Sequence, residues 1–519
     1  MKWIVLGEKN GRINLVSKSE VQGILPKGAF LTIEDGVTKF ILRVEDSAQL
    51  EPYSPTPLIV DMDLSPLQQD RVCKNIISAY RIHNFSKRQD GLIDYIKPQS
   101  IARLSNQEEI DAALGNIFQG PKVFIATIQY DQNQLLKDEN GKLITVSLPD
   151  EMFFHQILIC GKTGSGKTVA IKYLSQYFTE EFNGAVLAIN VKDVDLLKMD
   201  LPTPTVNEEI IKEWEAINKK PSGLNNFTIY HPANTNISLT KRVNKRITQK
   251  ITLDVKTIQP ESLTGLLQNI SDIGAMNFPN IFRYWQENQK KSHNIKEFTF
   301  SNFIQYYRNA ENDGCLFSTM NFRGEEATIR LHRGTYDNIL RNLDVALEFF
   351  DNEEATVLEA NDILQIGKMS VIDVSDKNGI QFGSIILRDL LSKIVHEKKE
   401  LRSEVPILII IDEVHMFYDT NASFEALGDL DTICRTGRSQ KIGVIFSSQN
   451  PQDIPKGLSS VINTKIFFKS DAGQVKTTGV SIQAQELESL KKGYAIVNIH
   501  ELSQIKIVKF PLALAGVLK

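Results

Sequence analysis

The chain has 519 residues, of which 42% are hydrophobic and 24% are charged, and its net charge is −4. These proportions are typical of a folded globular protein, and the length is enough for roughly two to four domains. The slightly acidic balance excludes a protein that is basic over its whole surface. Any contact with nucleic acid must therefore come from a local basic patch.

The cysteines are scattered and form no C-x-x-C pair; they are Cys73, Cys160, Cys315 and Cys434. This distribution argues against a zinc site or a disulfide framework and is typical of the reducing cytosol. The apolar run at the start of the chain is too short for a signal peptide, and the run from Val405 to Ile411 is too short to span a bilayer. We therefore expect a cytoplasmic protein with no membrane partner.

Residues 1–150 have the pattern of a small β domain. Three dipeptides that accept a positive φ indicate tight hairpin turns: Asn10-Gly11, Asp35-Gly36 and Asn140-Gly141. Further strands are expected at Leu58–Met62 and Val123–Tyr130. The capping box from Ser105 to Glu108 predicts one helix, from Asn106 to Ile117. Several short strands in succession predict an N-terminal β-barrel.

A glycine-rich loop follows the apolar run Phe153–Ile159. It has the form G-x-x-x-x-G-K-T and consists of Gly161, Lys162, Thr163, Gly164, Ser165, Gly166, Lys167 and Thr168. Such a loop, placed between a strand and a helix, presents its N–H groups to a triphosphate. Lys167 is then expected to reach the β- and γ-phosphates of ATP, and the Thr168 hydroxyl to bind Mg²⁺. The helix should run from Thr168 to Glu181.

Strands and helices alternate in the rest of the chain. Strands are predicted at Ala185–Val191, Lys368–Val374 and Pro406–Ile411, with a helix from Phe382 to Lys398 before the last of them. This order predicts an α/β fold, a RecA-like doubly wound parallel sheet. We expect the ATPase core to comprise residues 151–204 and 366–505. Residues 205–365 are then a mainly helical insertion with one strand at Phe227–Tyr230, and 506–519 a C-terminal tail.

Two carboxylates, Asp412 and Glu413, follow directly after an apolar strand. Buried parallel strands place such residues at their carboxyl ends, beside the phosphate-binding loop. Asp412 is therefore expected to hold Mg²⁺, and Glu413 to orient and deprotonate the attacking water. The alternative is a strand that ends in two surface acids.

Three more residues are candidates for the same reaction. Arg435 and Arg438 either complement the dipole of a helix end or stabilise charge on the γ-phosphate, in the same or a neighbouring subunit. Gln449 follows the strand that begins at Ile442 and either hydrogen-bonds the γ-phosphate or the water, or serves as a capping amide.

Superfamily-2 helicases share the loop and the Asp-Glu pair, but only 107 residues follow Asp412 (519 − 412), too few for a second RecA-like domain. The order of motifs instead resembles HerA-like ATPases of the HerA/FtsK superfamily. Besides the N-terminal barrel and the glycine-rich loop, the resemblance rests on Asn190-Val191-Lys192-Asp193, Ser370–Ser375, Asp412-Glu413, Arg435-x-x-Arg438, Ser448-Gln449-Asn450-Pro451 and Lys492–Val497.

The resemblance implies a homohexameric ring that couples ATP hydrolysis to movement of double-stranded DNA, usually beside a partner nuclease. It also implies that Arg438 is the charge-stabilising arginine and acts in its own subunit. Some archaeal relatives carry a further arginine just before the strand that leads into the loop, which acts on the neighbour's nucleotide. This chain has His155 at that place.

The candidate DNA contacts lie in two segments. One is the basic cluster Lys241, Arg242, Lys245, Arg246 and Lys250, which is otherwise a solvated surface. The other is Lys377, in a loop that six subunits of a ring would bring to a central pore, and which is otherwise an ordinary surface loop.

The sequence therefore predicts a cytoplasmic, ATP-driven motor on double-stranded DNA, working with a nuclease or another effector in DNA processing or anti-phage defence. Two other functions stay open. One is an ATPase ring that organises and gates a partner effector without moving DNA. The other is a motor for secretion of protein or conjugative DNA.

Overall fold

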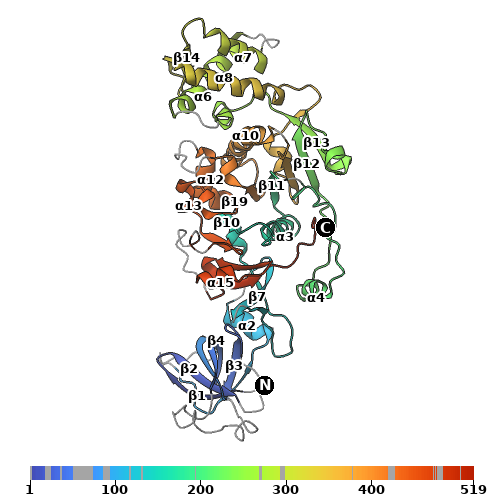
Figure 1. The fold of residues 1–519 in the computed structure, drawn as a ribbon, viewed down its shortest axis with the longest axis vertical. Helices are drawn as coiled ribbons and strands as arrows, with labels where there is room; N and C mark the ends of the chain where they lie inside the picture. Colours follow the sequence, from blue (N-terminus) through green and yellow to red (C-terminus); the bar gives the residue numbers. More distant parts are fainter. Residues whose placement is uncertain are drawn as a thin grey trace, which may run out of the picture.

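The computed structural model describes residues 3–17, 25–35, 38–50, 74–85, 94–115, 119–129, 132–192, 194–267, 272–292, 298–376, 378–418, 427–471, 473, 475, 483–502 and 504–518. The molecule is elongated, with a small barrel at one end, a large sheet in the middle and a helical region at the other end (Figure 1). None of the helices in these ranges is both long and apolar enough to cross a membrane.

The N-terminal barrel predicted from the turn signals is confirmed. Six antiparallel strands close in the order β1-β2-β5-β4-β3-β6. Their bounds are β1 Trp3–Lys9, β2 Arg12–Ser17, β3 Phe30–Asp35, β4 Thr38–Leu50, β5 Lys74–Asn84 and β6 Ile101–Leu104. Asn10 and Gly11 join β1 to β2 with φ of 53° and 74°, as a tight hairpin requires. Gly36 and the strand expected at 58–62 lie outside the described residues.

The helix after the barrel begins one residue later than the capping box predicted. Helix α2 spans Gln107–Ala113, and its cap is Asn106 paired with Glu109, rather than Ser105 with Glu108. The Ser105 hydroxyl instead accepts a hydrogen bond from Thr32 in the barrel, at 2.8 Å. Burial would raise the pKa of Glu109, but hydrogen bonds from Arg103 and Lys39 outweigh it and lower that pKa to about 2.

The predicted doubly wound sheet is also confirmed. Its central strands are all parallel and run in the order β17-β11-β18-β19-β10-β20. Their bounds are β10 Ile157–Cys160, β11 Ala185–Asn190, β17 Met369–Asp373, β18 Ile407–Asp412, β19 Ile442–Ser448 and β20 Thr464–Phe467.

Helices cover both faces of this sheet. Along β18, Leu408 and Ile410 pack on the face covered by α3 (Lys167–Glu180), whose Ala170, Leu174 and Phe178 are fully buried. Ile407, Ile409 and Ile411 pack on the opposite face, covered by α10 (Gly379–Lys399) and α12 (Asp429–Gln440). A strand buried on both sides explains the continuous apolar run in the sequence.

The sheet extends past both predicted limits of the ATPase core. On one side it continues through β21 (Tyr494–Asn498) and β22 (Ile507–Lys509) to β7 (Lys122–Gln129), β8 (Gln132–Leu135) and β9 (Thr145–Ser147). The barrel therefore ends well before residue 150, and the predicted tail supplies a strand. Local turn signals could not separate these strands from the barrel, because β7 joins the large sheet through β22, more than 300 residues away.

The predicted helical insertion likewise supplies three strands to the other side of the sheet. These are β12 (Phe227–Pro232), β13 (Thr248–Thr252) and β16 (Thr356–Val357), all parallel to β17. The part that stands beyond the sheet consists of α6 (Asp272–Ser292), α7 (Phe300–Asn309), the hairpin of β14 (Leu316–Met320) and β15 (Glu326–Arg330), and α8 (Arg333–Ala346) (Figure 1).

Shorter helices connect these elements. They are α4 (Glu208–Ala216), α5 (Ile237–Thr240), α9 (Ala360–Ile363), α13 (Lys456–Ser459) and α15 (Ala484–Glu488). The last residues of the chain lie along α3, where the buried Lys172 donates a hydrogen bond of 2.7 Å to the Gly516 carbonyl.

Candidate active site

The loop between β10 and α3 has the backbone conformation of a phosphate cradle. Gly164 and Gly166 have φ of +79° and +116°, which L side chains rarely adopt. A Cβ at Gly161 would lie 2.7 Å from the Phe468 side chain, and one at Gly166 would lie 2.9 Å from the Gly493 nitrogen. The tight turn and the close neighbours together explain why glycine occupies these positions.

Hydrogen bonds hold this loop against neighbouring strands. The N–H of Lys162 donates to Lys469 at 2.8 Å, and the N–H of Gly493 donates to Ser165 at 2.9 Å. The Lys167 ammonium turns into the loop and donates to the Gly161 carbonyl. Burial lowers its pKa, against an opposing effect of Asp412. The cation therefore lies inside the cradle, where a β- or γ-phosphate would meet it.

The residues predicted to bind Mg²⁺ line one small cavity. Thr168 and Asp412 face it together with Asn190 and Asp195. Burial raises the pKa of Asp412, although a hydrogen bond from Ser447 and the charge of Lys192 oppose that effect. A hydroxyl and a carboxylate beside a triphosphate site are the oxygen ligands that Mg²⁺ prefers, so these residues fit the ion.

Glu413 is held by groups from two neighbouring strand ends. It is buried, and its backbone is left-handed, with φ of 49°. Its carboxylate forms an ion pair with Lys192 and accepts a hydrogen bond of 3.2 Å from Gln449. Burial would raise its pKa, but these two hydrogen bonds outweigh burial and lower it. The side chain is therefore a carboxylate over the whole neutral range.

Gln449 also connects Glu413 to the glycine-rich loop. Its amide oxygen accepts a hydrogen bond of 3.3 Å from the Thr163 hydroxyl. The structure thus brings Thr163, Gln449, Glu413 and Lys192 into one chain of polar contacts. The sequence assigned no role to Lys192; the available signal was its position two residues past the end of β11, the strand beside β18.

A histidine and an aspartate lie on the other side of Glu413. Nδ1 of His415 is 3.8 Å from Glu413 and 3.7 Å from Asp453. The three side chains are close enough to one another to hold a metal ion. Asp453 also accepts a hydrogen bond from Ser448 at the end of β19, which fixes its position.

Arg438 lies at the opposite edge of the sheet from the loop. It is in the last turn of α12, and Lys441, just after this helix, accepts a hydrogen bond of 3.0 Å from Ile407 at the start of β18. The loop and Gln449 are at the other end of β19, whose seven residues span roughly 20 Å. This distance exceeds the reach of an arginine, so the same-subunit role is corrected: Arg438 cannot reach its own loop.

Arg435 and His155, the other two candidates at this edge of the sheet, each lie beside an acidic residue. Arg435 hydrogen-bonds Asp431 one turn earlier in α12, at 2.8 Å, as a helix-surface ion pair. His155 lies just before β10, 3.6 Å from Glu501. Its neighbour Gln156 donates to the Ile433 carbonyl of α12 at 3.3 Å. Arg438 is exposed and has no ion pair among the described residues. It follows Gly437, where an added Cβ would lie 3.2 Å from the Gln156 amide nitrogen, so this turn of α12 lies beside the residue after His155.

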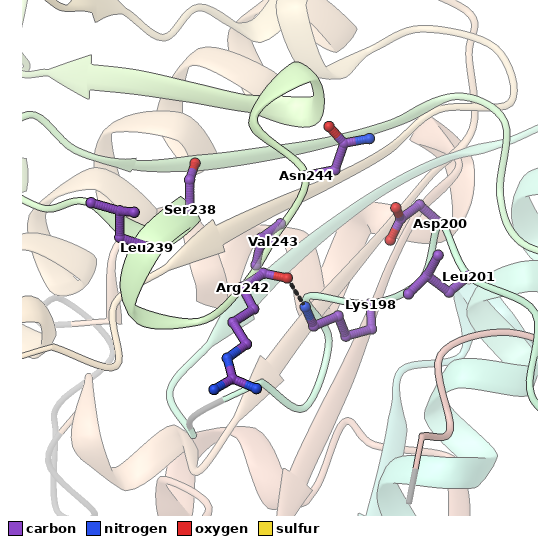
Figure 2. A pocket seen from close by; sticks show the side chains of 8 residues that line it. All are labelled: Lys198, Asp200, Leu201, Ser238, Leu239, Arg242, Val243 and Asn244. Carbon is purple, nitrogen blue, oxygen red and sulfur yellow. Dashed lines mark hydrogen bonds between the residues drawn. The ribbon is translucent and has the colours of Figure 1, made fainter.

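The residues predicted to contact DNA differ in burial. Lys241 is buried in an ion pair with Asp373 and also donates to Ser375, so it is corrected to a structural residue. Arg242, Lys245 and Arg246 are exposed. Arg242 lines a pocket with Lys198, whose ammonium donates to the Arg242 carbonyl (Figure 2). Lys377 lies outside the described residues.

A phosphate cradle at the carboxyl edge of a doubly wound parallel sheet, with two carboxylates beside it, defines a P-loop nucleotide-binding core. The family model DUF87, "Helicase HerA, central domain", matches residues 134–394. The chain belongs to this family.

Two curated relatives show how far the similarity extends. The chain is 28% identical over 199 residues to the "DNA double-strand break repair helicase HerA" of Sulfurisphaera tokodaii, covering 35% of this chain and 40% of that protein. It is 25% identical over 191 residues to the "Probable helicase MJECL08" of Methanocaldococcus jannaschii, covering 33% and 37%. The similarity thus spans less than half of each relative.

Solved structures with a similar arrangement include VirB4 of Thermoanaerobacter pseudethanolicus, with a TM-score of 0.46 and 14% identity, over 76% of this chain and 98% of that one. Plasmid coupling protein TrwB in complex with ADP and Mg²⁺ has a TM-score of 0.47 and 12% identity, over 72% and 89%.

Proposed function

We propose that this chain is an ATP-driven motor that moves double-stranded DNA and works as a homohexameric ring. The observation that carries the proposal is the constellation at one edge of the sheet: the Lys167 cradle, Asp412, and Glu413 held between Lys192 and Gln449. The name of the Sulfurisphaera tokodaii relative, a DNA double-strand break repair helicase, supports DNA as the substrate.

The hydrolysis step follows from the positions of these residues. Lys167 and the loop N–H groups would bind the phosphates of ATP, and Thr168 and Asp412 would hold Mg²⁺, which would supply positive charge to the phosphates. Glu413 accepts a proton from water, whose oxygen attacks the γ-phosphorus as the bond to the β,γ-bridging oxygen breaks. The lowered pKa of Glu413 keeps its side chain ionised, the form that can accept this proton.

Arg438 is proposed to act on the nucleotide of the neighbouring subunit. Its distance from its own loop excludes the same-subunit role, and its guanidinium is exposed at the edge of the core. The helix that carries Arg438 contacts Gln156, which follows His155, the position of the trans-acting arginine in the archaeal relatives that the sequence resembles. In a ring, this edge would face the next subunit's γ-phosphate, where a fixed cation stabilises the charge that builds up during transfer.

Steady-state ATP turnover with and without duplex DNA tests the proposal. The account predicts hydrolysis that depends on Mg²⁺, rises with duplex DNA and is lost in Lys167→Ala. Turnover that is unchanged by saturating duplex would contradict a DNA motor. Such a result would favour the alternative, a ring that organises a partner nuclease or defence effector. Sedimentation of the DNA-free protein should show about six chains per particle, and a monomer at micromolar concentration would contradict the ring.

A further inference from the structure

A pocket of about 560 Å³ opens between two segments at the carboxyl edge of the sheet (Figure 2). One wall is the end of the loop after β11, with Lys198, Asp200 and Leu201. The other is α5 and the residues that follow it, with Leu239 and Arg242. The second wall comes from the segment that contains the buried Lys241, which is fixed to Asp373 at the end of β17.

Two basic residues, Lys198 and Arg242, line this pocket. Lys198 is half-buried, and its ammonium donates to the Arg242 carbonyl. The left-handed backbone of Arg242, with φ of 50°, turns that carbonyl toward Lys198 while its own side chain extends away from the turn (Figure 2). This arrangement fixes the lysine beside the arginine without using the guanidinium.

The guanidinium of Arg242 has no ion pair with any acid in the described part of the chain, and the same holds for Lys245, Arg246 and Lys250. All four side chains are exposed. Several exposed arginines elsewhere are paired, as in Arg12–Glu45, Arg308–Asp344 and Arg333–Glu311. The acid that lines the pocket is Asp200, whose side chain is half-buried. A concentrated positive surface thus stands out in a chain of net charge −4.

We propose that this pocket binds a phosphodiester of the DNA backbone, with Arg242 and Lys198 as its ligands and Arg246 on an adjacent phosphate. The planar fork of arginine matches the geometry of phosphate oxygens, and the lysine supplies a second charge. Leu239, which is 78% exposed, and Leu201 offer apolar contact to the sugar. The cations extend along the chain beyond the pocket, which fits a polymer of phosphates better than a single free anion. The inference rests on the proposed function and names where DNA is held.

The test compares the intact protein with Arg242→Gln/Arg246→Gln and with a matched control, Arg330→Gln/Arg341→Gln. The control removes two exposed arginines from β15 and α8, in the region beyond the sheet. Duplex binding is measured by titration of two unrelated sequences at several salt concentrations. DNA-free ATP turnover of each variant reports that the core is folded.

The pocket variant should bind both duplexes more weakly and to the same extent. Its plot of log K against log salt should be shallower by about 0.9 for each lost phosphate contact, because fewer counterions are released. The control should bind as the intact protein does. If the pocket variant binds with unchanged affinity and slope while the intact protein binds duplex, the pocket is not the site.

Two further measurements distinguish free phosphate from the DNA backbone as the ligand, and an error about the pocket from an error about the proposed function. Inorganic phosphate should compete with duplex no better than chloride at the same ionic strength, and stronger competition would overturn the assignment to the DNA backbone. If the intact protein itself binds no duplex at any salt concentration, the proposed DNA motor is wrong, and this inference falls with it.

Discussion

Lys192 and Glu413 form an ion pair across the ends of two adjacent parallel strands, 221 residues apart in the chain. The glutamate side chain is 5% exposed and the lysine side chain 45% exposed. A buried carboxylate is costly without a partner, so Lys192 stabilises the ionised form of the proposed catalytic base.

Replacing Lys192 by Met should raise the pKa of Glu413, because burial then acts without its main opponent. A raised pKa means that the base becomes protonated at a higher pH, so the acidic limb of the kcat profile moves upward. Lys192→Arg should keep the limb near its original place, and Lys219→Met, which breaks a surface pair with Glu181, should leave it unchanged. The profile is measured from about pH 5 to pH 9. An unmoved limb in Lys192→Met would show that the pair does not tune Glu413.

Glu413→Gln should bind ATP with near-normal affinity and hydrolyse it very slowly, because the amide cannot accept the proton from water. Lys167→Ala should instead lose ATP binding, since the phosphates lose the cation inside the loop. Nucleotide affinity and turnover are measured separately for each variant. Normal turnover of Glu413→Gln would mean that another group accepts the proton.

Arg438→Ala should lower turnover by roughly three orders of magnitude with little change in ATP affinity, because the arginine stabilises charge that builds up in the transition state. Mixing Arg438→Ala subunits with Glu413→Gln subunits should restore part of the activity. In mixed rings, a Glu413→Gln subunit presents its intact arginine to a neighbour that still has its base. The absence of recovery at every mixing ratio would contradict the trans assignment.

Glu109→Gln should destabilise the chain at neutral pH, and this difference should shrink as the pH falls from about 5 to about 3. The pKa of Glu109 is lowered to about 2 in the folded chain. Its stabilising effect is therefore complete above the ordinary value of the unfolded chain and is lost as the pH falls toward the folded one. Thermal unfolding of both proteins across this range checks the sign. A difference that does not change with pH would mean that the Arg103 and Lys39 pairs contribute nothing.

The features that could be predicted from the sequence are those set by short stretches of chain. The loop from Gly161 to Thr168, the buried strand before Asp412 and the Asn10-Gly11 turn each depend on fewer than about a dozen consecutive residues. Their backbone conformation follows from glycine, from periodicity and from turn chemistry. The structure agrees with all three.

The features that could not be predicted depend on contacts between distant segments. Lys241 is one of five basic residues between positions 241 and 250, and only its pairing with Asp373 shows that it points inward. Lys192 gains its role from Glu413, and the place of Arg438 depends on which end of β19 follows α12. The predicted end of the barrel at residue 150 was too late for the same reason, since β7 pairs with β22 in the large sheet.

The central claim is that ATP hydrolysis at the Lys167–Glu413 site moves the protein along duplex DNA. Displacement of a third-strand oligonucleotide from a DNA triplex measures such movement directly, because a motor that passes along the duplex must remove it. The account predicts displacement that requires ATP and Mg²⁺ and is lost in Glu413→Gln, although this variant still binds the duplex. Hydrolysis stimulated by DNA without any displacement would contradict translocation and leave the ring as a scaffold for its partner.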